Sequence, residues 1–449
     1  MTPPADAKRP LMALDEALER LREVALRQQA QALLHRRGGT PEEKFEVGSE
    51  RIDGFEALGR VLAQDLVSPL HVPPLDNSAM DGYALRVADL PGAGHSLPQS
   101  QRIMAGRPGR ALAPGTCARI FTGAAVPPGA DAVVMQEQTS VPATPGPDPA
   151  GLPQVRFDVQ PVLGQNIRRQ GEDVRQGDTV LAQGLRLSPA ALGVAASVGA
   201  AHLWVHPRPR VALLSSGDEL FMPGEPLPVG AIYNANRHTL RGLIQACGAE
   251  CVDLGTVPDE LDATRRVLRE ASGCDLVISS GGVSVGDADH LRAAVQAEGE
   301  LDLWQLAIKP GKPFVLGRLN RSGAAGQALY MGLPGNPVAS WVTFLMLVRP
   351  VLGVLSGEPW REAQAMLLPA DFDWPHPDRR REFLRARRLP QGGVALYPHQ
   401  GSGVLSSAAW SDGLVDVRPG QPIAKGELVR FLPLSECLQP SSSLCQGTP

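Results

Sequence analysis

The amino-acid sequence predicts an α+β chain of several domains. Its 449 residues are too many for a single hydrophobic core, so three or four domains are expected. Glycine and proline are frequent, with 48 and 42 residues, which favours short elements and many turns over long helices. Residues 210–355 alternate strand-like and helical segments, a pattern typical of a parallel sheet with helices on both faces.

The N-terminal segments are expected to be helical. Leu11, Leu14, Leu18, Leu21 and Ala25 recur at helical spacing, which predicts an amphipathic helix whose apolar stripe serves packing or dimer contact. Glycines and a proline after residue 37 end this pattern. A second helix is expected to begin at a capping aspartate at position 53 and to run to residue 62.

The remaining elements follow from turn residues and apolar runs. Short apolar runs between Gly and Pro turns predict a small β domain over residues 68–160, with a loop at 141–153. A helix is expected at 190–198. Strands and turns return at 356–435, where we expect a β-barrel, and the Ser-, Pro- and Gln-rich tail is expected to be disordered.

Charge and hydropathy argue against nucleic-acid and membrane partners. The 43 basic and 47 acidic residues are interspersed and give a net charge of −4. The densest basic run, residues 379–388, is interpreted as an ordinary exposed strand rather than a nucleic-acid contact. The longest apolar stretch, 338–355, contains Ser, Thr, Arg, Pro and Gly, and the first residues do not resemble a signal peptide. We therefore expect a cytoplasmic protein, and its six cysteines, which form no CxxC pair, are expected to be free thiols.

Three strand ends of the predicted sheet carry small polar residues. They are the segments 215–219, 279–289 and 333–337. Ligands of open α/β sheets bind beyond the carboxyl ends of the strands, and glycines there let backbone N–H groups approach an anion. Asn336 can cap a helix that begins at Pro337. A phosphate or pterin pocket is therefore expected; no P-loop and no GxGxxG motif after the first strand are present, which disfavours kinases and dinucleotide-binding dehydrogenases.

Charged residues at the same sheet edge suit a metal and an anionic substrate. Asp218, Glu219, Asp287 and Asp289 are candidate Mg²⁺ ligands, because Mg²⁺ combines one or two carboxylates with substrate oxygens. The alternative for the last two is that one of them caps the next helix. Lys309 and Lys312, flanked by prolines, are expected to neutralise developing phosphate charge.

The β domain holds a second acidic group. Asp76 and Asp81 lie close in sequence, Thr122 precedes a glycine, and Asp173 lies in a turn after two arginines. Each of these segments taken alone could be ordinary turn chemistry.

Together these motifs resemble the molybdopterin molybdenumtransferases, the family that includes the gephyrin E domain. The resemblance runs in order from about residue 10 to 435. The segments that carry it are 59–63, 75–84, 121–124, 171–173, 216–220, 280–289, 309–313, 333–337, 381–385 and 400–403. It implies an enzyme that inserts molybdate into adenylyl-molybdopterin with release of AMP, using Mg²⁺. It also implies an elongated homodimer of four-domain subunits, in which the α/β domain of one subunit faces the small β domain of the other.

The resemblance assigns roles residue by residue. The residues that it implies to hold the pterin nucleotide are Ser216, Gly217, Asp218, Gly281, Gly282, Ser284, Gly286, Pro334, Gly335, Asn336, Pro337, Ser402 and Ser406. The residues that it implies to be catalytic are Asp76, Asp81, Thr122, Asp173, Glu219, Asp289, Lys309 and Lys312, the first four from the partner subunit. Upstream adenylyltransferases and downstream molybdoenzyme maturation factors are the further partners expected.

The expected domain bounds follow from the same resemblance. We expect a discontinuous linking and dimerisation domain at 10–72 and 160–207, and an inserted β domain at 73–159. We expect a three-layer α/β molybdopterin-binding domain at 208–356, a β-barrel at 357–435 and a tail at 436–449. Two other functions stay open: a scaffold, as in gephyrin, and the related ATP-dependent adenylyltransferase. The choice between molybdate and tungstate also stays open.

Overall fold

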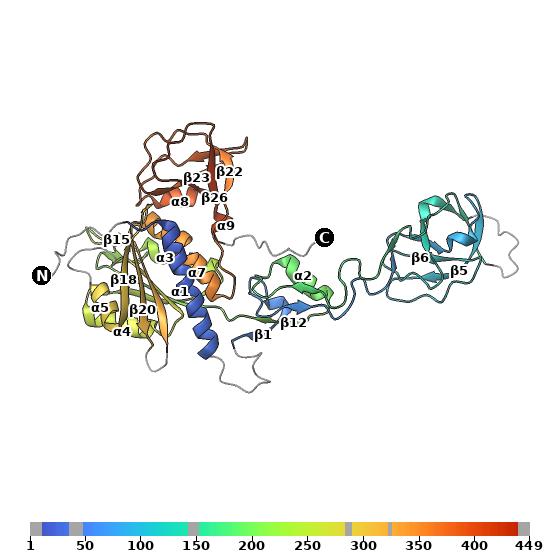
Figure 1. Cartoon of the computed structure of the whole chain (residues 1–449), viewed down its shortest axis with the longest axis horizontal. Helices are drawn as coiled ribbons and strands as arrows, with labels where there is room; N and C mark the ends of the chain where they lie inside the picture. The colour runs from blue at the N-terminus through green and yellow to red at the C-terminus, as the bar shows by residue number, and fades with distance from the viewer. Residues whose placement is uncertain (1–10, 36–47, 142–151, 283–289, 322–325, 439–449) are drawn as a thin grey trace.

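The chain forms an elongated molecule in which residues from distant parts of the sequence lie together. The computed structural model describes residues 11–35, 48–141, 152–282, 290–321 and 326–438. Figure 1 shows an α/β unit at one end with the C-terminal sheet beside it, a small β unit at the other end, and a narrow linking part between them. This arrangement places the two groups of polar residues at opposite ends of one chain.

The α/β unit is built on a six-stranded sheet of order β16-β13-β17-β21-β20-β18. Its strands are β13 (Arg210–Ser216), β16 (Glu250–Val257), β17 (Leu276–Ser280), β18 (Gly299–Gln305), β20 (Pro313–Asn320) and β21 (Gln327–Leu333). The first four strands of this order pair in parallel, but β20 pairs antiparallel with β21 and β18. The expectation of a parallel sheet is therefore wrong for β20, which runs opposite to both of its neighbours. The connections on either side of β20, 306–312 and 321–326, are too short for the crossover that a parallel neighbour needs.

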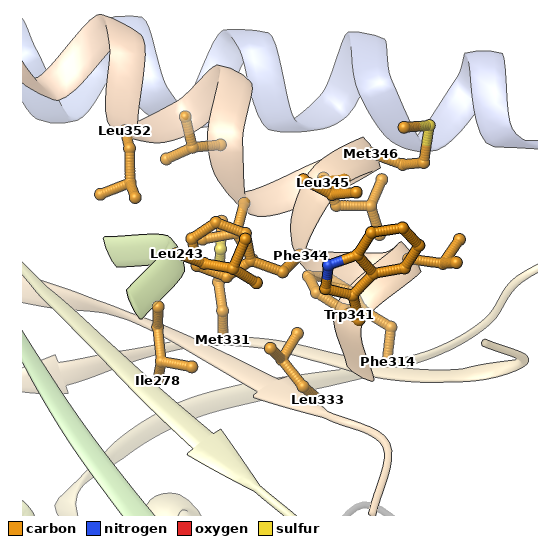
Figure 2. Packing of buried hydrophobic residues seen from close by; sticks show 14 of the residues in the cluster. Leu243, Ile278, Phe314, Met331, Leu333, Trp341, Phe344, Leu345, Met346 and Leu352 are labelled. Atoms are coloured by element: carbon orange, nitrogen blue, oxygen red, sulfur yellow. The ribbon is translucent and has the colours of Figure 1, made fainter. Parts of the chain in front are cut away.

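Helices cover both faces of this sheet. They are α1 (Leu14–His35), α3 (Ala235–Ala246), α4 (Leu261–Ala271), α5 (His290–Glu298), α6 (Pro337–Thr343) and α7 (Arg349–Leu355), with a π-helical segment η5 (Phe344–Val348) before α7. Alternate strand residues face opposite sides: Ile278 packs with α3, α6 and α7, whereas Val277 packs with α4 and α5. Figure 2 shows the first of these cores, where Trp341 and Phe344 pack against Met331 and Leu333.

The predicted N-terminal helix packs within its own chain. Leu14, Leu18, Leu21 and Ala25 are buried against α7 and η5, so the apolar stripe of α1 belongs to the core of the α/β unit. Leu11 lies before the helix and is exposed. Within the described residues, one helical stretch, Pro337–Leu355, is long and apolar enough to cross a membrane, and 89% of its apolar window is buried inside the protein. This stretch is a core element.

The linking part combines two separate stretches of sequence. Its elements are β1 (Glu50–Asp53), η2 (Gly54–Glu56), β2 (Leu66–Val67), β11 (Thr179–Leu181), α2 (Pro189–Ser197) and β12 (His202–Val205), with β1 paired to β12 and β2 to β11. The helix expected from residue 53 to residue 62 is wrong. Asp53 caps only the single 3-10 turn η2, Gly59 adopts φ 71°, and Leu62 forms a bridge with Val205. A left-handed glycine ends a helix, so the chain leaves the turn here.

The β unit is a six-stranded sheet of order β7-β4-β6-β5-β9-β8. Its strands are β4 (Gly82–Leu85), β5 (Ser96–Ile103), β6 (Cys117–Ile120), β7 (Ala132–Met135), β8 (Thr139–Ser140) and β9 (Gln154–Phe157), with 3-10 turns η3 (Val87–Asp89) and η4 (Gln136–Gln138). A separate antiparallel pair, β3 (Asn77–Ser78) with β10 (Ile167–Arg168), joins the stretch of chain that enters the β unit to the stretch that leaves it.

The C-terminal sheet contains β22 (Met366–Pro369), β23 (Arg381–Arg388), β24 (Val394–Leu396), β25 (Gly413–Val417) and β26 (Leu428–Pro433), with α8 (Leu405–Trp410) and α9 (Leu434–Leu438). A bridge between Ala370 and Val394 closes these pairings into a ring. The sheet also receives β19 (Ile308–Lys309), which comes from the α/β unit and pairs with β23. Helix α9 runs into the stretch expected to be a disordered tail, and residues 439–449 lie outside the described residues.

The Arg-rich run was interpreted as an ordinary exposed strand, and the structure corrects this. Most of it is β23, an inner strand with neighbours on both sides. Arg385 is fully buried, at 0% exposure, and Arg381 pairs with buried Asp416. Alternation along the strand places these arginines at an interface with other elements, which the sequence pattern alone does not reveal.

Candidate active site

A cleft of about 880 Å³ lies between the strand ends of the α/β unit and the C-terminal sheet. Eleven of the predicted site residues line it: Ser216, Glu219, Gly281, Gly282, Lys309, Lys312, Pro334, Gly335, Asn336, Pro337 and Ser402. Gly217, Asp218 and Ser406 do not line it. Ser284, Gly286, Asp287 and Asp289 lie outside the described residues. The three loops expected to converge therefore do so, through their described parts.

Asn236 joins two of these loops. Its Nδ2 donates hydrogen bonds to Ser280 Oγ at 2.8 Å and to the carbonyl oxygen of Gly335 at 2.7 Å. Asn236 lies in the first turn of α3, and the preceding Asn234 caps that helix by accepting from the N–H of Arg237. Sequence reasoning missed Asn236. The available signal was its position at a helix start next to a strand end.

Close backbone contact holds the loop after β17 against the end of β13. Gly281 has φ 89°, and a Cβ atom there would lie 2.9 Å from the carbonyl oxygen of Ser216. Any larger residue would be both strained and too close to this oxygen. The glycine therefore sets the distance between two strand ends that line the cleft.

The N-terminus of α6 faces the C-terminal sheet. Asn336 occupies the capping position, but its side chain makes no capping hydrogen bond, so the predicted side-chain cap is wrong. The N–H of Val338 instead donates to the carbonyl oxygen of Ser402 at 2.9 Å. This bond brings Ser402 to the cleft and satisfies a helix donor that a side-chain cap would otherwise serve.

The two lysines have different surroundings. Lys309 Nζ lies 3.0 Å from Glu382 Oε1 and 3.4 Å from Asp378 Oδ2. A hydrogen bond from Arg380 is the main cause that lowers the pKa of Asp378 well below its ordinary value. The side chain of Lys312 is exposed and makes no hydrogen bond or ion pair with any described residue. Lys312 is therefore the more available cation for a ligand.

Buried Arg385 organises the loop that carries Ser402. Its guanidinium donates to Ser407 Oγ at 3.0 Å, to the carbonyl oxygen of Phe383 at 3.1 Å and to that of Gly401 at 3.2 Å. Burial lowers the pKa of Arg385 to about 10. The side chain of Gln400 accepts from the N–H of Arg385 and donates to its carbonyl oxygen. These contacts fix residues 400–402 at the cleft.

Only part of the predicted metal site falls within the described residues. Glu219 is the one described carboxylate that lines the cleft, and Asp218 Oδ1 accepts from the N–H of Asp259 at 3.3 Å. The described residues include no group of three or more His, Cys, Asp or Glu that could hold a metal. A single carboxylate in a cleft suited to phosphates fits Mg²⁺, which completes its octahedron with water and substrate oxygens.

The polar residues of the β unit lie away from the cleft of the same chain. Asp81 Oδ1 accepts from both the N–H and the hydroxyl of Thr122, at 2.8 and 2.7 Å, and these bonds lower the pKa of Asp81. Burial works to raise the pKa of Asp76, but hydrogen bonds from Gln170 and Arg169 outweigh it, so this pKa is also lowered. Asp76, Asp81, Thr122 and Asp173 are all absent from the lining of the cleft. Figure 1 places the β unit at the far end of the molecule.

Three family models match the chain in order. They are described as "MoeA N-terminal region (domain I and II)" over residues 12–199, "Probable molybdopterin binding domain" over 212–353, and "MoeA C-terminal region (domain IV)" over 368–434. The chain belongs to the MoeA family. The resemblance inferred from the sequence motifs is thereby confirmed.

Named members of the MoeA family match most of the chain. Molybdopterin molybdenumtransferase from Haemophilus influenzae is 42% identical over 321 residues, which are 71% of this chain and 76% of the relative. Molybdopterin molybdenumtransferase 2 from Mycobacterium tuberculosis is 38% identical over 377 residues, which are 81% of this chain and 89% of the relative. The crystal structure of the molybdopterin biosynthesis MoeA protein from Pyrococcus horikoshii OT3 superposes with a TM-score of 0.74 at 25% identity, covering 94% of this chain and 100% of that one.

The cysteines take no part in this MoeA-family cleft. The five described cysteines are free, as expected, and four of them are buried. Burial raises the pKa of Cys247 to about 11 and that of Cys117 to about 12, so both are protonated at neutral pH. Thiols of this kind pack as small apolar side chains.

Proposed function

We propose that this chain inserts molybdate into adenylyl-molybdopterin and releases AMP, as a Mg²⁺-dependent enzyme in the last step of molybdenum cofactor synthesis. The observation that carries the proposal is the cleft in which three strand-end loops meet Lys312, Arg380 and Ser402. Glycine-rich strand ends suit the phosphates of a pterin nucleotide, and the basic residues suit its charge. The names of the relatives give the reaction class.

The proposed roles follow the surroundings of each side chain. Ser216, Gly281, Gly335 and Asn336 would hold the phosphates and the pterin along the strand ends. Lys312 would stabilise the negative charge that develops as water cleaves the phosphoanhydride between AMP and the pterin phosphate. Lys309 is turned toward Glu382, so its charge would act on the electrostatic potential of the nearby part of the cleft.

Mg²⁺ would neutralise phosphate charge when bound. Glu219 would be its ligand among the described residues, together with oxygens of the substrate. Asp218, Asp287 and Asp289 are the other candidate ligands predicted from the acidic residues at this sheet edge. This assignment rests on the fit of one cleft carboxylate with the way proteins bind Mg²⁺.

We propose that the active enzyme is a homodimer. Within one chain, the Asp81–Thr122 pair and the cleft belong to different units, and a second copy would bring its β unit to the cleft of the first. Exposed apolar side chains on the linking part support such an assembly: Phe55 is 97% exposed and Leu58 55% exposed. A closed dimer with two identical composite sites follows from the usual twofold symmetry of homo-oligomers.

The proposed domain division keeps the predicted bounds, with the linking domain at 10–72 and 160–207 and the β domain at 73–159. The α/β domain would occupy 208–356 and the C-terminal β-barrel 357–435. We also propose a cytoplasmic location, and contacts with an upstream adenylyltransferase and with downstream maturation factors, since a reactive cofactor has to be received and passed on. Nucleic acid and membrane are not proposed as partners.

Cofactor production tests this function. The purified protein would be incubated with adenylyl-molybdopterin, Mg²⁺ and molybdate in the absence of ATP, and the product given to a cofactor-free molybdoenzyme. Recovery of molybdoenzyme activity is the expected result. A requirement for ATP would favour the adenylyltransferase reaction, and no recovery with a folded dimer would favour a scaffold.

A further inference from the structure

A row of aromatic and basic side chains crosses the sheet of the β unit. Tyr83 on β4 pairs with Arg119 on β6, and Arg119 pairs with Arg102 on β5. Residues paired across neighbouring strands project from the same face of the sheet. Phe121 follows Arg119 by two positions and its ring contacts both arginines. The four side chains therefore form one cluster that runs from buried Tyr83 to exposed Arg102, which we call the Arg102–Arg119 cluster.

Aromatic rings hold the two guanidiniums together. The guanidinium carbons of Arg102 and Arg119 each lie 4.9 Å from the centre of the Phe121 ring, and that of Arg119 lies 5.0 Å from the centre of the Tyr83 ring. Like charges on directly paired strand positions repel each other. Cation–π attraction to the rings offsets part of this repulsion without neutralising either charge.

The positive charge of the cluster has little compensation. Arg119 donates to the carbonyl oxygen of Gly82 and to the side-chain oxygen of Gln136, both of which are neutral acceptors. The side chain of Arg102 is exposed and makes no hydrogen bond or ion pair with any described residue. Asp81 acts on Arg119 by its charge, but its hydrogen-bonding oxygen is already occupied by Thr122. The N–H donors of Arg102 are therefore available to a ligand.

We propose that the Arg102–Arg119 cluster is a binding site for a tetrahedral oxyanion of the phosphate or molybdate type. A guanidinium presents its N–H groups as a planar fork that matches two oxygens of such an anion. Arg102 would supply direct hydrogen bonds, and Arg119 would supply charge from a position fixed by Tyr83 and Phe121. The ring contacts hold both guanidiniums in place before the anion arrives, which lowers the entropy cost of binding.

The inference deepens the proposed function and rests on it for its role. Thr122 follows Phe121 directly in the sequence, so the cluster adjoins the Asp81–Thr122 pair that the proposed dimer brings to the partner's cleft. The anion site would then place positive charge from the second subunit beside that cleft. The partner's cleft and this cluster would hold different oxyanions, or different parts of one substrate.

Local anion binding by the full-length protein tests the site. The probes are AMP, inorganic phosphate and molybdate, each titrated at low ionic strength, with amide hydrogen exchange read for peptides spanning 100–103 and 117–123. Arg102→Gln is the test variant, because the side chain of Arg102 makes no hydrogen bond on which folding depends. Arg156→Gln is the matched control: Arg156 lies on β9 of the same sheet and pairs with Asp158 at 3.6 Å.

The wild type is expected to show anion-dependent protection of these peptides. Arg102→Gln should weaken the binding of at least one probe at these peptides by about tenfold, the loss expected for one charge-assisted contact at an exposed site. Arg156→Gln should leave it unchanged within about twofold, and Arg102→Lys should retain part of it. The probe whose affinity falls most identifies the occupant as phosphate-bearing or as molybdate.

Equal affinities of the wild type and Arg102→Gln for all three probes would overturn the inference. Its outcome is separable from that of the proposed function, because AMP release by the wild type is measured in a different assay. A wild type that binds anions through Arg102 but releases no AMP contradicts only the proposed function. A wild type that releases AMP, with an Arg102→Gln variant equal to it in anion binding and KM, contradicts only the anion site.

Discussion

Lys309 Nζ lies 3.0 Å from Oε1 of Glu382, a carboxylate whose side chain is only 1% exposed. The pair joins β19 of the α/β unit to β23 of the C-terminal sheet, where the two residues are register partners. Glu382 Oε2 also accepts from the N–H of Asp378 and from Trp374 Nε1. Lys309 thus compensates a buried charge at the wall of the cleft. Lys312, the other lysine of the cleft, compensates no such charge.

Substitutions of Lys309 and Lys312 are therefore expected to have different effects, the first on stability and the second on turnover. Lys309→Gln removes the ion pair to the buried carboxylate of Glu382 and should lower stability by about 1 to 3 kcal/mol, because Lys309 itself is 43% exposed and Arg380 also acts on Glu382 by its charge. Lys312→Gln should leave stability unchanged and lower kcat by about a hundredfold, the loss typical of one donor to developing charge. Thermal unfolding and steady-state AMP release of both variants check this. Equal stability losses, or normal turnover in Lys312→Gln, would contradict the assignment.

Asp416 is expected to make the C-terminal sheet sensitive to acid. Burial alone would raise the pKa of Asp416, but hydrogen bonds and charge from Arg381 and Arg430 lower it below its ordinary value. A lowered folded-state pKa stabilises the fold above the unfolded pKa of about 3.9, and this contribution disappears as the pH falls through the folded value. Asp416→Asn should cost about 3 kcal/mol or more at pH 7 and progressively less below about pH 4.

Thermal unfolding between pH 7 and pH 2.5 measures this effect. Asp412→Asn is the control, because its pair with Arg388 is exposed at 54% and 36% and should contribute at most about 1 kcal/mol. A stability difference between the wild type and Asp416→Asn that does not change with pH would contradict the charge-based explanation.

Arg385 is expected to act on substrate binding through the loop that it holds. Arg385→Met removes the donors to Gly401 and Ser407, so Ser402 should lose its fixed position at the cleft. The KM for adenylyl-molybdopterin should rise by about tenfold, while kcat changes less, because each lost hydrogen bond contributes on the order of 1 kcal/mol. Arg385→Lys should recover part of the affinity. A change confined to thermal stability, with KM unaltered, would leave Arg385 a purely structural residue.

The composite site predicts complementation between subunits. Asp81→Asn and Glu219→Gln alter the β unit and the cleft, respectively, so a mixed dimer would keep one intact site. After random reassociation, the mixture should regain about one quarter of the wild-type rate, since half of the dimers are mixed. Glu219→Gln mixed with Lys312→Gln is the control, because both changes lie in the cleft and no intact site forms. A mixture of the first pair no more active than either variant alone would contradict a shared site.

Local patterns in the sequence were enough to predict the strand-end loops. Ser216, Gly281 and Gly335 each follow an apolar run, and the end of a parallel strand has a known place in an open sheet. Asn236 was missed because its role depends on two loops that approach it from residues 280 and 335. Arg385 and Arg380 were missed because an Arg-rich strand looks solvated until its sheet neighbours are known. The direction of β20 was wrong because element alternation does not distinguish a hairpin from a crossover.

Release of AMP from adenylyl-molybdopterin, followed with and without molybdate, tests the central claim most directly. The purified wild type with Mg²⁺ is expected to release AMP rapidly when molybdate is present and much more slowly when it is absent, because cleavage of the phosphoanhydride and capture of the metal occur in one cleft. Release at the same rate in both conditions would show that the protein cleaves the nucleotide without inserting the metal. No release by a folded dimer in either condition would contradict the enzymatic role altogether.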